Sequence, residues 1–366
     1  MAESQRALAA LAQLQDSCRF SPMTANRRKQ IHVRTPTPTT QRLTASLSGT
    51  PYDLYDYLRN ALSRRGTVLY LAYGSNLSNE TFRGSRGIKP LSQINVQVPS
   101  LRMTFDLPGL PYAEPCFANS APRDPKGKSY HKDQWHKGLI GVVYEVTPED
   151  YAHIIATEGG GSSYTDVLVD CHPFASSDPR MPVPKEPTLP PFKAHTLYAP
   201  VEDPPKYHGR LQRPNPGYAQ ASARYLKLIT DGAEELELPF EYQDYLHSLR
   251  PFTITTNKQR LGQFVFLMTC APIVFAIFGM NKIFADDNGV VPVWLSELLA
   301  AVFKGIWASY DSFFKPMFGE GERTIGDGKA RRSLRRPVHN LANVKRTHLL
   351  QGHLETHRIL RQSHFH

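Results

Sequence analysis

One uncharged stretch constrains how the last third of this chain of 366 residues can fold. No charged side chain occurs between Arg260 and Lys282, and a stretch of that length can cross about 30 Å of hydrocarbon as a helix. Pro272, the absence of helical periodicity and the basic residues before Leu261 favour a transmembrane helix over a buried core helix. The sequence therefore predicts a transmembrane helix at this point.

The segment that follows, residues 290–318, is apolar except along one side. Glu297, Lys304 and Asp311 recur every seven residues and form one polar stripe, which suits a helix in the membrane interface or a returning second span. The pattern leaves a single span, a hairpin and an interfacial helix open. Basic residues on both sides of residues 261–318 predict a membrane-anchored protein whose amino-terminal domain faces the cytosol.

Composition divides the remainder of the chain into three parts. Residues 1–52 are basic and poor in acids, so we expect them to be disordered, with a mitochondrial presequence as the alternative. Residues 53–256 have the short β-rich runs of a globular domain. Residues 319–366 form a second basic segment that is expected to be disordered. This tail carries much of the net charge of +10 but almost no aromatic residues, so no specific nucleic-acid partner is predicted.

The sharpest pattern in the globular part follows a buried strand predicted from Val68. It reads Tyr73-Gly74-Ser75-Asn76-Leu77. Gly74 allows a ligand to approach the backbone closely, while Ser75 and Asn76 add hydrogen-bond donors. Such a turn can bind a carboxylate or a developing oxyanion. The alternative is an ordinary connection between a strand and a helix that begins near Asn79.

A second pattern places an acidic side chain at the end of a helix. Thr147 and the proline after it are typical of a helix start. Glu158 falls on the same side of that helix as Tyr151 and Ile154, and three glycines at 159–161 end the helix. Apolar neighbours and the negative end of the helix dipole both disfavour a charged carboxylate. This suits a group that takes up and returns a proton; the alternative is an exposed glutamate on a frayed turn.

Four features in the same order resemble the γ-glutamylcyclotransferase family. They are the turn at 73–77, the Glu-Gly at 158–159, the tyrosine Tyr164 that leads the next strand, and the Leu-Pro-Phe-Glu-Tyr-Gln at 238–243. The resemblance implies an α+β fold, with a mixed β-barrel surrounded by helices. It also implies a pocket for a small γ-glutamyl compound that needs no metal and no organic cofactor.

The resemblance also assigns roles to individual residues. It implies that Glu158 is the essential glutamate, acting as general acid and base, and that the turn from Tyr73 to Leu77 holds the γ-glutamyl group. It implies pocket tyrosines at Tyr164 and, depending on the strand register, at Tyr198. The family releases 5-oxoproline and an amino acid or amine. Substrates could be γ-glutamyl amino acids, γ-glutamylamines or glutathione-like thiols; the alternative function is an inactive, membrane-tethered ligand-binding scaffold.

Overall fold

The computed structural model describes residues 35–124, 135–158, 164–199, 213, 219–284 and 292–326. The possible presequence and most of the basic tail lie outside these residues, so both expectations stay predictions.

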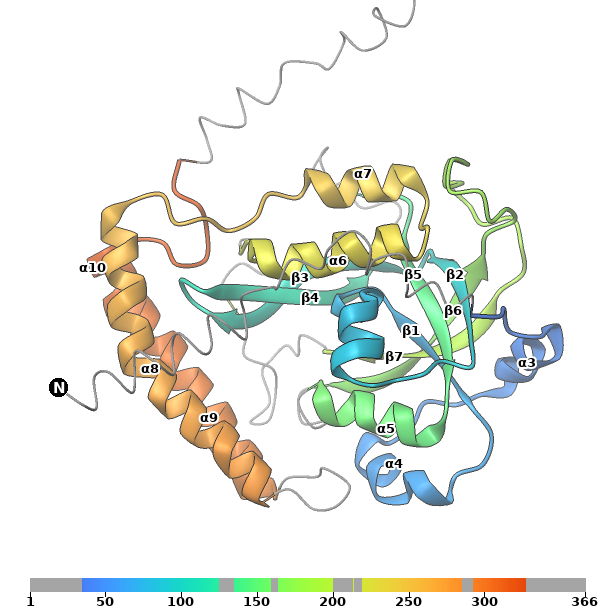
Figure 1. Ribbon diagram of the computed structural model, residues 1–366, viewed down its shortest axis with the longest axis horizontal. Helices are drawn as coiled ribbons and strands as arrows, with labels where there is room; N and C mark the ends of the chain where they lie inside the picture. Colours follow the sequence, from blue (N-terminus) through green and yellow to red (C-terminus); the bar gives the residue numbers. More distant parts are fainter. Residues whose placement is uncertain are drawn as a thin grey trace, which may run out of the picture.

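Five strands close into a barrel in the order β1-β5-β2-β6-β7 (Figure 1). Their bounds are β1 Val68–Ala72, β2 Ser92–Val98, β5 Leu139–Val146, β6 Thr165–Pro173 and β7 Phe192–Tyr198. Strand β1 pairs antiparallel with β5 and parallel with β7, whereas β6 pairs antiparallel with both β2 and β7. The predicted mixed barrel is therefore confirmed.

Strand β1 is buried on both faces, which explains its unbroken apolar sequence. Because successive side chains of a strand point to opposite faces, Val68 and Tyr70 join one core cluster while Leu69 and Leu71 join the other. The strand thereby fixes the position of the turn that follows it.

Helices cover the outside of the barrel. They are α3 Thr40–Ala45, α4 Leu54–Asn60, α5 Pro148–Thr157, α6 Ala223–Glu235 and α7 Phe240–Ser248. Helix α5 begins as predicted, with the Thr147 side chain accepting a hydrogen bond from the Asp150 N–H. Helix α3 falls inside the segment that was expected to be disordered up to residue 52. That expectation is corrected, because Arg42 in α3 donates to the Thr67 carbonyl at 2.8 Å and ties the segment to the barrel.

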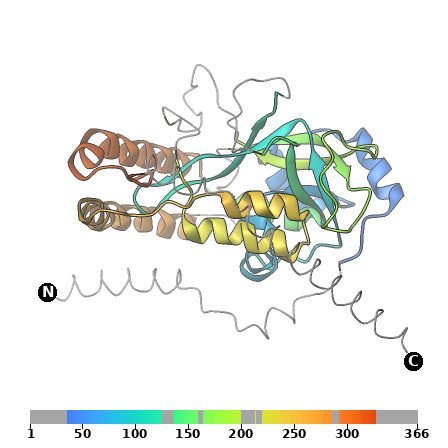
Figure 2. The same cartoon turned by 90° about the horizontal axis from the view of Figure 1, so that it is seen from above.

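A long β-hairpin that the sequence did not predict extends from the barrel. It consists of β3 Leu101–Leu110 and β4 Glu114–Pro122. Its turn contains Tyr112 in the left-handed backbone region, with φ of 62°. The hairpin connects the barrel to the carboxyl-terminal helices, which lie at the end of the molecule away from α3 (Figures 1 and 2).

The carboxyl-terminal helices form a helical hairpin. Its elements are α8 Asn257–Phe284, α9 Val293–Ser309, a π-helical turn Tyr310–Phe314 and α10 Lys315–Phe318. Helices α8 and α9 lie side by side in both views (Figures 1 and 2). Phe266, Trp307 and Tyr310 bury the ring of Tyr112, and Trp307 Nε1 donates to the Gly109 carbonyl at 3.1 Å. The helical hairpin is therefore packed on the tip of β3 and β4.

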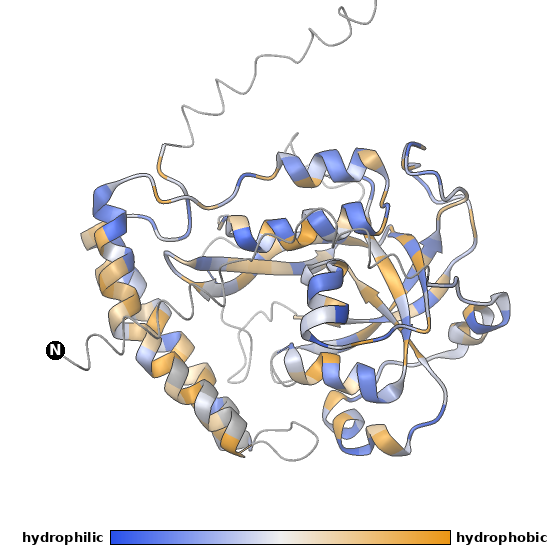
Figure 3. Cartoon of the chain, viewed as in Figure 1, coloured by the Kyte–Doolittle hydropathy of each residue, from blue (hydrophilic) through white to orange (hydrophobic). Residues whose placement is uncertain are grey.

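No helix in the described ranges is long and apolar enough to span a membrane. The prediction of a transmembrane helix within residues 261–318 is therefore wrong. Much of the apolar sequence is used in packing: Phe266 and Val274 of α8 are buried in the same cluster as Ile306 of α9. Both helices carry many hydrophobic residues (Figure 3). Some of their apolar side chains, such as Phe264 and Trp294, are exposed.

The beginning of the predicted disordered tail is also ordered. Residues 319–326 run back along the molecule, where the Gly321 carbonyl accepts from Tyr112 N at 2.7 Å and the Glu322 carbonyl accepts from Gln220 N at 2.9 Å. The carboxylate of Glu322 pairs with Arg213. These backbone contacts explain why the ordered structure continues past residue 318.

Candidate functional site

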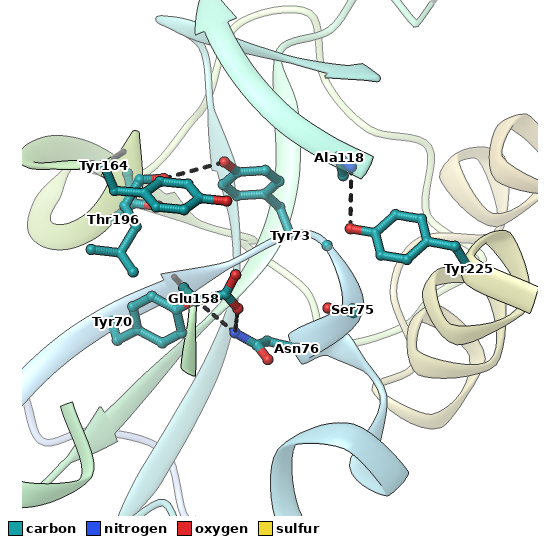
Figure 4. A pocket seen from close by; sticks show the side chains of 11 residues that line it. Tyr70, Tyr73, Ser75, Asn76, Ala118, Glu158, Tyr164, Thr196 and Tyr225 are labelled. Carbon is teal, nitrogen blue, oxygen red and sulfur yellow. Dashed lines mark hydrogen bonds between the residues drawn. The ribbon is translucent and has the colours of Figure 1, made fainter. Parts of the chain in front are cut away.

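A small pocket opens where β1 ends (Figure 4). It is lined by residues from β1, the turn after it, β4, the end of α5, the position before β6, β7 and α6: Tyr70, Tyr73, Gly74, Ser75, Asn76, Ala118, Glu158, Tyr164, Thr196, Leu197 and Tyr225. Six of these are site residues that the sequence predicted. The two separate patterns, the turn after β1 and the acidic end of α5, therefore meet in one pocket.

The turn after β1 is a single 3₁₀ turn over Ser75–Leu77. Leu77 N donates to the Gly74 carbonyl at 3.0 Å, which closes the turn. A Cβ atom at Gly74 would lie 3.3 Å from the hydroxyl oxygen of Tyr225. Glycine fits here because any larger residue would be tight against the Tyr225 side chain of α6. The helix expected from Asn79 is a short π-helix, η5, over Glu80–Ser85.

Glu158 caps the carboxyl end of α5 and turns its side chain into the pocket. Its N–H donates to the Ile154 carbonyl at 3.0 Å. Its Oε1 accepts hydrogen bonds from Asn76 Nδ2 at 3.1 Å and from Arg86 Nη2 at 2.6 Å. The side chain is 24% exposed. The sequence predicted apolar neighbours and the negative end of the helix dipole beside this carboxylate. The structure adds a guanidinium and an amide, which stabilise its charge.

Arg86 is a site residue that sequence reasoning missed. Its guanidinium contacts both Thr157, the last residue of α5, and Glu158, the residue that caps the helix. Nη1 donates to Thr157 Oγ1 at 2.7 Å. No local sequence pattern marks an arginine 72 positions before its carboxylate partner. The possible signal is the pair of arginines, Arg83 and Arg86, in the segment directly after the glycine turn.

Tyrosine hydroxyl groups surround the carboxylate. Burial, followed by the nearby charge of Glu158, raises the pKa of Tyr70 and of Tyr164 well above the usual range. Burial also raises the pKa of Tyr73 and of Tyr225. All four phenols therefore stay neutral near pH 7 and can donate hydrogen bonds. The sequence did not mark Tyr70, which is hidden within an apolar strand, or Tyr225, which lies in the first turn of α6.

Two predicted site residues do not line the pocket. Leu77 is fully buried in the core, since its place in the turn directs it inward. Tyr198 is the last residue of β7 and pairs with Thr165 of β6. The pocket takes Thr196 and Leu197 from β7 instead, so the register that would have placed Tyr198 in the pocket is not found.

The described residues contain no group of three or more histidine, cysteine, aspartate or glutamate side chains placed to hold a metal ion. The pocket itself offers one carboxylate, hydroxyl groups and the donors of the glycine turn. Such a set can bind a polar substrate and transfer protons.

Known proteins of similar sequence identify the family. The chain is 33% identical over 264 residues to the γ-glutamyl cyclotransferase gliK of Aspergillus fumigatus. The aligned region covers 70% of this chain and 90% of that protein. The chain is 30% identical over 266 residues to the γ-glutamyl cyclotransferase aclK of Aspergillus oryzae, again with 70% and 90% covered. The chain belongs to the γ-glutamyl cyclotransferase family of enzymes.

Two further comparisons concern parts of this cyclotransferase. Residues 256–317, which contain α8 and α9, match the family described as the AclK C-terminal domain. A solved structure titled "Gamma-glutamyl cyclotransferase" covers 52% of this chain and 93% of its own length, at 18% sequence identity and a TM-score of 0.36. The assignment to the family rests on the sequence relatives.

Proposed function

We propose that this cyclotransferase releases 5-oxoproline and an amino acid or amine from a γ-glutamyl compound, with Glu158 as general acid and base. The carboxylate takes a proton from the substrate's α-amino group, whose nitrogen then forms a bond to the γ-carbonyl carbon. The bond from that carbon to the departing nitrogen breaks, and the same carboxyl group returns the proton to this nitrogen. One side chain can do both because the proton is removed and returned within the same turnover.

The observation that carries the proposal is the contact between Asn76 of the glycine turn and Glu158 at 3.1 Å. It places an acid beside a turn that can bind charge, inside one pocket (Figure 4). Holding the reacting amine near its own carbonyl supplies a large part of the rate enhancement. The neutral hydroxyl group of Tyr164 can hold the γ-glutamyl group or the oxygen on which charge develops. The Tyr73 hydroxyl lines the same pocket and donates to Ser120 Oγ at 3.2 Å.

Replacement of the acid tests this role. We expect Glu158→Gln to lower the rate of 5-oxoproline release by about 10²- to 10⁴-fold, the usual contribution of general acid–base catalysis. Glu149→Gln is the matched control, because Glu149 is an exposed acid in the first turn of the same helix. Release of 5-oxoproline from a panel of γ-glutamyl amino acids, amines and thiols is measured by chromatography. Turnover by Glu158→Gln at the unmodified rate would contradict the assignment.

The relatives are named for γ-glutamyl compounds, and the same panel of substrates will show which class this enzyme prefers. The leaving group is the part of the substrate that varies among these classes. Measuring kcat/KM for each member of the panel ranks the leaving groups directly.

Attachment to a membrane remains a prediction for this chain, now as binding to a membrane surface. Leu261 and Phe264 of α8 and Trp294 of α9 are each about half exposed, and exposed apolar side chains on a helix favour interfacial binding. We expect the full chain to float with anionic lipid vesicles, and Phe264→Glu to reduce the bound fraction. Equal flotation of the two proteins would contradict binding through this face.

A further inference from the structure

We propose that Arg86 is a positioning residue that fixes the Oε1 atom of Glu158 and thereby leaves Oε2 as the atom that exchanges the proton with substrate. This inference rests on the proposed role of Glu158. Arg86 does not line the pocket, so it acts through the carboxylate and not by contact with the substrate.

The hydrogen bonds of Glu158 are distributed unequally over its two oxygen atoms. In the described part of the chain, both side-chain donors end on Oε1: Asn76 Nδ2 at 3.1 Å and Arg86 Nη2 at 2.6 Å. Figure 4 shows the other oxygen turned toward the side of the pocket where Tyr73 and Tyr164 lie. A proton taken from the substrate would therefore arrive at Oε2, because Oε1 is already engaged by a cation.

The guanidinium of Arg86 holds the end of α5 in place as well as the charged carboxylate of Glu158. Nη1 donates to Thr157 Oγ1 at 2.7 Å, and that hydroxyl in turn donates to the His153 carbonyl at 2.8 Å. Arg86 thus contacts two consecutive residues, Thr157 and Glu158, through its two terminal nitrogens. A lysine could hold the charge but could not make both contacts in this planar geometry.

The π-helix η5 explains why Arg86 reaches α5. Phe82 within it is fully buried and stacks on Tyr144 of β5, with ring centroids 4.2 Å apart. Arg86 follows the last residue of η5, and its N–H donates to the Thr81 carbonyl at 3.0 Å. Single π-helical turns are rare in proteins as a whole, but those that occur are often found at functional sites. Here the wide turn, anchored by Phe82, directs a side chain that is only 13% exposed toward the end of α5.

The charges that face Glu158 determine how the pH dependence should change. The neighbouring phenols of Tyr70, Tyr73, Tyr164 and Tyr225 are neutral near pH 7 because burial raises their pKa values. Arg86 is the positive group that contacts the carboxylate. Its removal should therefore make the ionised carboxylate harder to form at low pH.

The first test compares Arg86→Met and Arg86→Lys with the full-length protein. We expect Arg86→Met to lower kcat by about tenfold to a hundredfold, as expected when a reacting group is misplaced, with KM within about twofold. The acid limb of the pH profile of kcat should move to higher pH. Arg86→Lys should restore the acid limb but only part of kcat. Unchanged kcat and an unmoved acid limb in Arg86→Met would overturn the inference.

Two controls separate positioning from folding. Arg83→Met changes the other arginine of the same segment, whose Nε donates to Asn79 Oδ1 at 2.9 Å and not to α5, and it should leave kcat and the acid limb unchanged. Thr157→Val removes the second contact of Arg86, together with the hydrogen bond from the hydroxyl to the His153 carbonyl, but keeps the contact with Glu158. It should therefore lower kcat less than Arg86→Met does. Should Arg86→Met fail to fold, Thr157→Val and Arg86→Lys decide: normal kcat in both overturns the inference.

Failure of the proposed function is distinguishable from failure of this inference. If Glu158→Gln remains active, the carboxylate has no proton-transfer role and the proposed function fails. If Glu158→Gln is inactive but Arg86→Met behaves like the natural protein, only the inference about Arg86 fails. In the Glu158→Gln background, Arg86→Met should cause no further loss of residual turnover, since Arg86 acts through that carboxylate.

Discussion

Two arginine–carboxylate ion pairs in this molecule have the same chemistry but different roles. In the barrel pocket, Arg86 and Asn76 engage one oxygen of Glu158. At the helical hairpin, Arg213 donates to both oxygens of Glu322 and to both oxygens of Asp311, at 2.7 to 2.9 Å. Arg213 also lies over the ring of Trp307, 4.1 Å from its centroid.

The two ion pairs differ in how many carboxylate oxygens accept a hydrogen bond. Each oxygen of Glu322 and Asp311 accepts a hydrogen bond from Arg213, so these acids are structural. Glu158 keeps one oxygen directed into a pocket, so it retains a site for a proton. A buried ion pair thus indicates chemistry only when the surrounding donors leave part of the acid unoccupied.

The largest effect is expected from removing the structural arginine. Arg213→Met leaves Glu322, which is 3% exposed, without its cation, and should lower the free energy of unfolding by about 3–5 kcal/mol. Denaturant unfolding measures this loss. Arg180→Met, which removes an arginine paired with Asp178 at the surface, is the control and should cause no measurable change.

Arg213→Met also tests whether the two arginines differ in function. Under conditions where Arg213→Met stays folded, we expect its kcat and the acid limb of its pH profile to match those of the natural protein. A shift of the acid limb like the one expected for Arg86→Met would show that the two ion pairs do not differ in function.

Local features of the site could be predicted from the sequence, while its long-range contacts could not. The buried strand β1, the glycine turn and the capped start of α5 each depend on neighbours within a few residues, and the structure contains all three. Arg86 was missed because the barrel, not a local pattern, brings η5 to the end of α5. Tyr225 was missed for the same reason, since α6 follows the glycine turn by about 150 positions.

The error on α8 has the same origin. The length and apolarity of residues 261–281 are local properties, and they predicted a transmembrane helix. The packing partner is Tyr112 at the tip of the β-hairpin, whose carbonyl accepts from Gln263 Nε2 across a sequence separation of 151. Without that hairpin in view, a helix buried on one side could not be distinguished from a spanning one.

A smaller effect is expected from filling the space beside the glycine turn. In Gly74→Ala the new methyl group would lie 3.3 Å from the Tyr225 hydroxyl oxygen, so the turn or the Tyr225 side chain must give by a few tenths of an ångström. We expect kcat/KM to fall by about tenfold to a hundredfold. Gly305→Ala in α9 is the control, since a Cβ atom there meets no heavy atom within 4 Å, and its kcat/KM should be unchanged. A normal kcat/KM for Gly74→Ala would show that the close approach of α6 is not needed for turnover.

The smallest expected effect is a change in how the free energy of unfolding depends on pH, and it compares the pocket with the helical hairpin. Burial raises the pKa of Tyr73 in the pocket and of Tyr112, which lies at the tip of β3 and β4 and packs against the helical hairpin. The unfolded chain loses these protons near pH 10 while the folded chain keeps them, so the stability that they contribute is complete below about pH 10 and falls as the pH rises further. Tyr73→Phe and Tyr112→Phe should each make this decline shallower by up to about 1.4 kcal/mol per pH unit, measured by urea unfolding. At neutral pH only Tyr73→Phe should lower the rate of 5-oxoproline release, because only that hydroxyl faces the pocket. Equal activity in both variants would mean that the pocket tyrosine, like its counterpart at the helical hairpin, has only a structural role.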